Sequence, residues 1–197
     1  ERYSVCSYKK HEGEVKEITD KMNVTQGKLA MGFVTNVTCG TRESAALTVF
    51  NSIFGSGAHS KLFNNVREKL SLCYYASSRL NKLKGTMTVS SGVEFKNFDK
   101  AYDEILKQLE SIKNGEISDW EMKSAKSALI NILSSYDDSM TATEEFYFNQ
   151  ALTGESFTVA DFIESIKEIS CEDVISVANK IELDTVYKLS GDGRNEQ

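Results

Sequence analysis

A glycine turn, a short helix and the start of a strand follow one another between Phe54 and Ser78. Glycine adopts backbone angles that other residues avoid, so Gly55-Ser-Gly57 predicts a sharp turn after the preceding segment. The apolar side chains after this turn stand at helical spacing, as Leu62, Phe63, Val66 and Leu70. Strand character begins about three residues later. The sequence therefore predicts a turn, a short amphipathic helix and a strand in succession.

Other stretches alternate apolar with smaller or polar residues, the period of two expected of a half-buried strand. The clearest case runs from Gly27 through Leu29, Met31, Phe33, Thr35 and Val37. A strand at about 15–22 should precede it. Segments 73–80 and 86–93 form a predicted antiparallel hairpin, and a last strand at about 185–190 can return to the sheet.

The remaining segments have helical spacing. One predicted stripe contains Ala46, Val49, Phe50 and Ile53, and a second contains Phe98, Tyr102, Ile105, Leu109 and Ile112. Capping signals precede the later helices: Ser118 with Glu121, Thr141 with Glu144, and the single residues Thr158 and Ser170. This order predicts an α+β domain, with helices packed on one face of a mainly antiparallel sheet. We expect a polar lead-in at 1–16 and one domain at 17–197.

Composition narrows the possible partners. Twenty-three Lys and Arg against 29 Asp and Glu give a net charge of −6, which argues against nucleic acid or an anionic membrane surface. The longest strongly apolar run, 29–34, is far shorter than the roughly 20 residues that span a bilayer. Four scattered cysteines, without a metal-binding spacing, predict reduced thiols and a cytoplasmic location. The first residues do not form a signal peptide, and a start without Met suggests a fragment or processed chain.

Common catalytic motifs are missing from the sequence. Its two histidines, His11 and His59, cannot form His-x-x-Glu-His, and segment 11–15 ends in Val where the second histidine would stand. That polar segment contains Gly13 and predicts a solvated tail. We expect His59 to be a structural residue at the glycine turn. The turn lacks the Gly-Lys-Ser/Thr continuation of a phosphate loop, and no nucleophile elbow accompanies either histidine. No metal site is predicted in this chain.

The segment from 54 to 78 closely resembles the signature of the second-half domain of pitrilysin and insulinase-type zinc peptidases, the inverzincins. Several positions agree in register with that signature: Gly55, Gly57, Ser60, Leu62, Phe63, Arg67, Glu68, Leu72 and Tyr74. Mild departures are Lys61 for Arg, Leu70-Ser71 for Arg-Gly or Lys-Gly, and Cys73 for a small residue. The order of elements is also similar to one half of mitochondrial processing peptidase, over residues 15–191.

The resemblance implies the metallohydrolase fold of the processing-peptidase type and a supporting part in a composite active site. Tyr74 would donate a hydrogen bond to the developing oxyanion, and Arg67 would hold a substrate carbonyl or carboxylate. Gly55, Gly57 and Ser60 join these two as expected substrate-binding residues. This chain would need no cofactor of its own, because zinc is expected in an N-terminal half or partner subunit. The implied substrate is an extended peptide that adds to a sheet edge.

Three alternatives remain open. Without the resemblance, Arg67 is most simply a solvent-facing helix residue, and Tyr74 is a strand aromatic in the core. The chain could also belong to a catalytically silent member that binds peptides or scaffolds an active homologue. A stand-alone enzyme that uses other residues is the weakest of the three.

Overall fold

The structure of the protein is a computed structural model that describes residues 13–37, 39 and 42–192. Its strands form one sheet in the order β1-β5-β2-β4-β3. The strands are β1 (Lys16–Met22), β2 (Gly27–Val34), β3 (Cys73–Asn81), β4 (Thr86–Val93) and β5 (Glu182–Gly191). All five were predicted from the sequence, with ends that differ by a few residues.

The sheet is mainly antiparallel, which confirms the predicted α+β class. β2 pairs antiparallel with both β4 and β5, and β3 pairs antiparallel with β4. β1 and β5 are parallel, with Lys16 opposite Thr185 and Met22 opposite Gly191. The last strand thus lies between the first two, which supports the proposal of one domain from residue 17 onward. Most of the predicted polar lead-in, residues 1–12, lies outside the described residues, and residues 13–15 are exposed.

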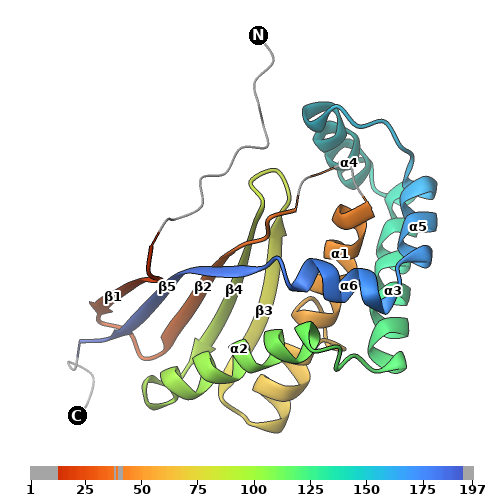
Figure 1. The fold of residues 1–197 in the computed structure, drawn as a ribbon. Coiled ribbons are helices and arrows are strands. Elements are labelled where there is room, and N and C mark those ends of the chain that lie inside the picture. The colour runs from red at the N-terminus through yellow and green to blue at the C-terminus, as the bar shows by residue number, and fades with distance from the viewer. Residues whose placement is uncertain (1–12, 38, 40–41, 193–197) are drawn as a thin grey trace.

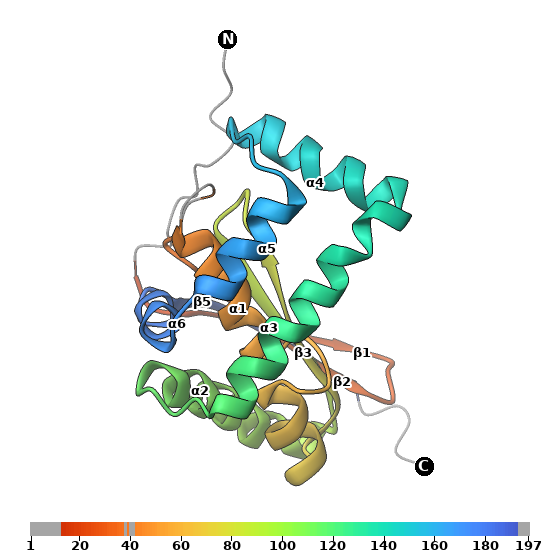
Figure 2. The ribbon, with the colours of Figure 1, turned by 90° about the vertical axis from the view of Figure 1, so that its right-hand side faces the viewer.

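The helices cover one face of the sheet, as Figures 1 and 2 show. Helices α1, α2 and α6 lie against the strands, while α3 and α5 form an outer layer beside α1. The α-helices are α1 (Arg42–Phe54), α2 (Phe98–Lys113), α3 (Asp119–Ser134), α4 (Met140–Thr153), α5 (Val159–Glu168) and α6 (Cys171–Ala178). A π-helix, η1 (Leu62–Lys69), and two 3-10 turns, η2 (Phe95–Asn97) and η3 (Tyr136–Asp138), complete the described part. None of the helices described has the length and apolar character needed to cross a membrane.

The core lies between the sheet and the first helix layer. Leu29, Met31 and Phe33 of β2 are buried, while Lys28, just before them, is exposed. The predicted stripe of α2 meets them from the helix side, except that Tyr102 is only partly buried. Burial of this apolar area is the main stabilising contribution to the fold.

The predicted caps are mostly confirmed. Ser118 forms a capping box with Glu121, and Thr158 and Ser170 cap α5 and α6 in the same way. The predicted cap at Thr141 is wrong, because α4 already begins at Met140. Ser139 has the extended backbone of a cap residue and accepts a hydrogen bond from the Ala142 backbone N–H at 3.4 Å.

Candidate functional site

The glycine turn fixes where η1 begins. The Ser78 backbone N–H of β3 donates a hydrogen bond to the Gly55 carbonyl at 2.9 Å. A Cβ at Gly55 would lie 2.7 Å from the Ser78 nitrogen and 2.8 Å from Leu62 Cδ1. Only glycine therefore allows α1 to end this close to the sheet. Gly57 has a φ of +106°, which L side chains rarely adopt.

Ser60 is completely buried and closes the same turn. Its hydroxyl donates to the Gly57 carbonyl at 2.7 Å and accepts from the Phe63 backbone N–H at 3.3 Å. In the described structure, Gly55, Gly57 and Ser60 thus hold the start of η1. None of the three lines the cavity that contains Arg67 and Tyr74. Direct contact between these three residues and a substrate stays a prediction.

A second contact ties η1 to α3. The ammonium of Lys61 lies 2.9 Å from Glu121 Oε1, and both side chains are largely buried. Burial alone would raise the pKa of the Glu121 carboxyl, but hydrogen bonds from Ser118 and Lys61 outweigh burial and hold it below its ordinary value. Glu121 therefore stabilises the N-terminus of α3 and also holds Lys61, the residue just before η1.

Arg67 lies in the last turn of η1, with 41% of its side chain exposed. Its guanidinium carbon is 4.7 Å from the centroid of the Phe63 ring, within the range of a cation–π contact. Its Nε lies 3.5 Å from Glu68 Oε1, a distance typical of a loose surface pair. The π-helical turn is a geometry that is frequent at functional sites.

Two irregularities in the backbone place the Tyr74 side chain at the surface. Ser71, just before β3, has a φ of +50°, and the register of β3 against β4 shifts between Cys73 and Tyr75. Such a bulge leaves an extra residue on one strand and re-aims its side chain. Tyr74 is that residue, and it is 60% exposed. The alternative that places Tyr74 in the core is therefore wrong.

One open cavity contains both residues. It has a volume of about 370 Å³ and is lined by Arg67, Glu68, Ser71, Leu72, Cys73, Tyr74 and Glu94. The structure therefore brings the predicted arginine and tyrosine together at the edge strand of the sheet.

Cys73 and Glu94 were missed as members of this site. The predicted hairpin could have identified Glu94. Cys73 pairs antiparallel with Val93, so Glu94, which follows Val93, lies at the end of the hairpin where β3 begins. The Glu94 carboxylate also forms an ion pair with the Lys96 ammonium, with 2.8 Å between Nζ and Oε2. Burial raises the pKa of the Cys73 thiol, so the thiol is mainly protonated at neutral pH.

His59 lies away from this cavity, against α1. Its Nε2 is 3.0 Å from the hydroxyl of Ser52, and burial lowers the pKa of the ring. A neutral imidazole held by a hydroxyl agrees with the predicted structural role. The part of the chain that the structure describes contains no group of three or more His, Cys, Asp or Glu that could hold a metal ion.

Comparisons with known proteins agree with this architecture. Residues 3–129 match the family described as the peptidase M16 inactive domain. "Probable inactive metalloprotease YmfF" of Bacillus subtilis is 41% identical over 176 residues, which are 89% of this chain and 41% of that protein. A conserved protein from Enterococcus faecalis has a crystal structure that matches with a TM-score of 0.91 at 32% identity, over 97% of this chain and 45% of its own. A protease from Helicobacter pylori shares the fold, with a TM-score of 0.80 at 20% identity over 89% of this chain and 44% of its own. The chain thus spans less than half of these relatives.

Proposed function

Because this chain belongs to the family of peptidase M16 inactive domains, we propose that it forms the zinc-free half of a zinc metalloendopeptidase. More than half of the length of the similar proteins lies outside the matched region, which leaves room for a zinc-bearing domain. A homologous partner subunit could supply it as well. The described residues do not fit a zinc site, so the metal would be held by the other half. The location that we propose is cytoplasmic.

The observation that carries this proposal is the shared cavity of Arg67 and Tyr74. The hydroxyl of Tyr74 is proposed to donate a hydrogen bond to the peptide carbonyl oxygen as negative charge develops on it. The guanidinium of Arg67 offers several N–H donors for a neighbouring carbonyl or carboxylate of the peptide. Gly55, Gly57 and Ser60 contribute by fixing η1, from which Arg67 projects.

The edge of the sheet also suits an extended peptide. β3 is an edge strand whose outer side has no partner strand among the described residues, although its Ser78 N–H already donates to the Gly55 carbonyl. A peptide that lies along such an edge is bound through its backbone, largely independent of its sequence. Selectivity would then depend on side chains around the cavity.

A second candidate function is a silent subunit that binds peptides or scaffolds an active homologue. It is favoured by the name of the Bacillus subtilis relative, which describes that protein as an inactive metalloprotease. The two candidates differ in one respect that can be measured, namely whether the assembled protein hydrolyses peptides.

The first experiment measures zinc content and cleavage of an unstructured peptide library. The complete native gene product and the chain of residues 1–197 are compared side by side. Zinc and cleavage in the complete protein, with neither in the shorter chain, would support the peptidase half. Absence of both from both proteins would support the silent subunit.

The role of Tyr74 is tested in the complete protein by Tyr74→Phe, which removes only the hydroxyl. Loss of one oxyanion donor should lower kcat by about 100-fold or more, with little change in peptide affinity. The matched control is Tyr75→Phe, because the neighbouring Tyr75 packs over Gly92 and lies outside the cavity. Unchanged turnover in Tyr74→Phe would remove Tyr74 from the mechanism.

A further inference from the structure

A second and larger cavity lies between the helices and the tip of the β3–β4 hairpin. Its volume is about 590 Å³, within the usual range for sites that bind small molecules. It shares no lining residue with the cavity of Arg67 and Tyr74. Residues of α3, α4, α5 and the hairpin turn line it, so it opens beside the helix that stands furthest from the sheet (Figure 1).

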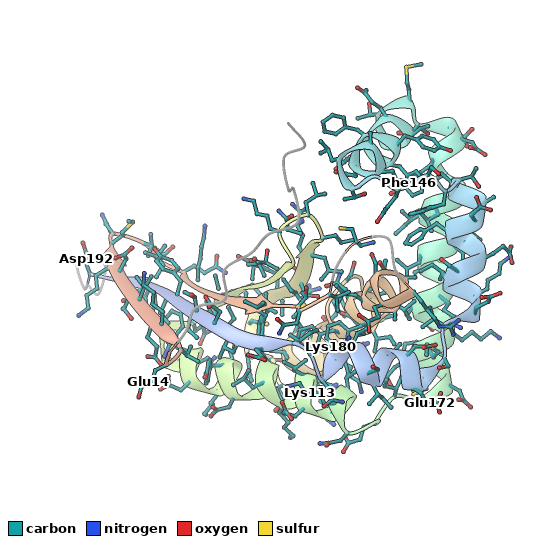
Figure 3. All side chains as sticks on the ribbon, turned by 45° about the horizontal axis from the view of Figure 1, so that its top comes forward. Glu14, Lys113, Phe146, Glu172, Lys180 and Asp192 are labelled. Atoms are coloured by element: carbon teal, nitrogen blue, oxygen red, sulfur yellow. The ribbon has the colours of Figure 1, made fainter. Side chains whose placement is uncertain are left out.

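Aromatic rings form one wall of this cavity. Phe146 of α4 lies among them, and Figure 3 shows it on α4, close to the junction with α5. Its ring centroid is 5.8 Å from that of Phe157 and 6.2 Å from that of Phe162. Phe157 and Phe162 stack at 5.7 Å, and Tyr136 meets Phe146 edge-on at 6.0 Å. These rings offer a preformed apolar surface to a side chain of similar size.

A cation faces this wall. The ammonium of Lys82 lies 5.0 Å from the centroid of the Phe162 ring. Burial lowers the pKa of Lys82 to about 8, and electrostatic interactions with Cys39 and then Glu155 offset only part of this effect. Glu155 is therefore close enough to act on Lys82, yet no ion pair joins them. Lys82 is thus a partly buried ammonium that rests on an aromatic ring and has no paired carboxylate in the described structure, so it can still take an anionic partner.

Two buried polar atoms at the same cavity have no partner in the described structure. Gln150 is 4% exposed, and its Oε1 accepts the Phe157 backbone N–H at 2.8 Å, but its Nε2 donates to nothing. Glu155 Oε1 is also buried and accepts no hydrogen bond. Buried polar groups are nearly always satisfied, so one free donor and one free acceptor beside one cavity indicate a missing ligand.

We propose that this cavity binds a free α-amino acid with a large apolar side chain. Lys82 and the Nε2 of Gln150 would hold the α-carboxylate, and Glu155 would accept from the α-ammonium. The side chain would pack against the wall formed by Phe146, Phe157 and Phe162. This site does not depend on the proposed peptidase function.

Other ligand classes satisfy fewer of these groups. A hydrocarbon would leave Lys82, Gln150 and Glu155 unpaired, and a simple carboxylate would face the negative charge of Glu155. A simple amine would face Lys82. A residue at one end of a peptide carries only one of the two charges. The exposed Glu145 lies at the rim, where water screens its charge.

The proposal is tested by isothermal titration of the protein with L-phenylalanine and L-leucine. Three matched compounds complete the series: 3-phenylpropionate, 2-phenylethylamine and N-acetylphenylalanine amide. L-Phenylalanine should bind at least about tenfold more tightly than any of the three, because each lacks one or both charge-assisted hydrogen bonds. Equal binding of 3-phenylpropionate, or no binding of either amino acid, would overturn the proposal.

Three variants test the named groups. Lys82→Met, Glu155→Gln and Gln150→Glu should each weaken L-phenylalanine binding by about tenfold or more. Gln150→Glu keeps an oxygen acceptor for the Phe157 N–H, so it tests the missing donor rather than the local fold. Lys84→Met removes an exposed lysine from the same hairpin turn and should leave binding unchanged. Thermal unfolding of each variant verifies folding, and unaltered affinity in folded Lys82→Met would refute the site.

Discussion

At the scale of single residues, Ser71 shows how the sequence can conceal a backbone constraint. The resemblance places Ser71 where the related signature has glycine, and its φ of +50° explains why glycine is usual there. Non-glycine residues in this left-handed region cost about 1–2 kcal/mol. Arg67 and Tyr74 were identified from the signature, but their meeting in one cavity depends on this turn and on the bulge, neither of which leaves a pattern in side chains.

Ser71→Gly should stabilise the protein by about 0.5–1 kcal/mol, because relief of the left-handed strain exceeds the added entropy of the unfolded chain. The expected rise in Tm is about 2 °C, measured by calorimetry. Asn36 is a matched control with a φ of +53°. Asn36→Gly should instead destabilise, since the Asn36 side-chain amide donates to the Lys180 carbonyl at 2.8 Å. Equal responses of the two variants would contradict this account.

The buried pair of Lys61 and Glu121 predicts a dependence of stability on acid pH. The folded state lowers the pKa of Glu121, so the unfolded chain takes up the proton first as the pH falls. The stabilisation is complete above about pH 4.3, the unfolded value, and is lost as the pH falls through the folded pKa. Glu121→Gln keeps an acceptor for Ser118 but lacks this titration.

Urea unfolding between pH 7 and pH 3 measures the effect. The difference in free energy of unfolding between the wild type and Glu121→Gln should shrink as the pH falls. Glu144→Gln on the exposed surface of α4 should follow the wild type throughout. A constant difference for Glu121→Gln would exclude the pair as an acid-sensitive contact.

At the scale of elements, strands and helices followed from apolar spacing and capping residues. The π-helical form of η1 did not, because the apolar residues Leu62, Val66 and Leu70 stand four apart, a spacing that also fits an α-helix, and π-helices are rare. The start of α4 was misplaced for a related reason. Thr141 and Glu144 have the right spacing for a capping box, but Ser139 lies earlier and takes the cap.

The junction of α1, η1 and β3 predicts unequal effects at two glycines. Gly55→Ala should destabilise the protein by about 1–3 kcal/mol, because the new methyl group would press against Ser78 and Leu62. Gly32→Ala on β2 is the control, since the nearest atoms to its Cβ would be 3.8 Å away. It should change stability by less than about 0.5 kcal/mol. Denaturant unfolding compares the two, and a larger loss at Gly32 would refute the close approach at Gly55.

At the scale of the whole molecule, the position of β5 could not be read from local patterns. Its alternation predicts a strand, but nothing in that pattern specifies insertion between β1 and β2 or parallel pairing with β1. Long-range pairing is decided by burial of shared surface, as for Val186, which is buried on β5 opposite Met31. The domain can form its central sheet only when residues near both ends of the described chain come together.

Native-state hydrogen exchange should therefore distinguish the amides of the sheet from those of α4. Amides of β2 and β5 should exchange only through global unfolding, because both strands lie inside the sheet and each pairs with a strand on either side. Amides of α4, which stands apart from the sheet in Figure 1, should exchange through local opening at lower free energy. Exchange of β5 at the same low free energy as α4 would contradict a cooperative sheet.

The parallel pairing of β1 with β5 also determines how the domain responds to force. The chain enters β1 beside Thr185 and leaves β5 beside Met22, so its two ends emerge at opposite ends of one ladder. Tension between residues 13 and 192 would pull these strands past each other lengthwise. All seven paired positions would then bear the force at the same time, instead of separating one pair after another. The domain is thus arranged to withstand stretching along the direction of β1 and β5.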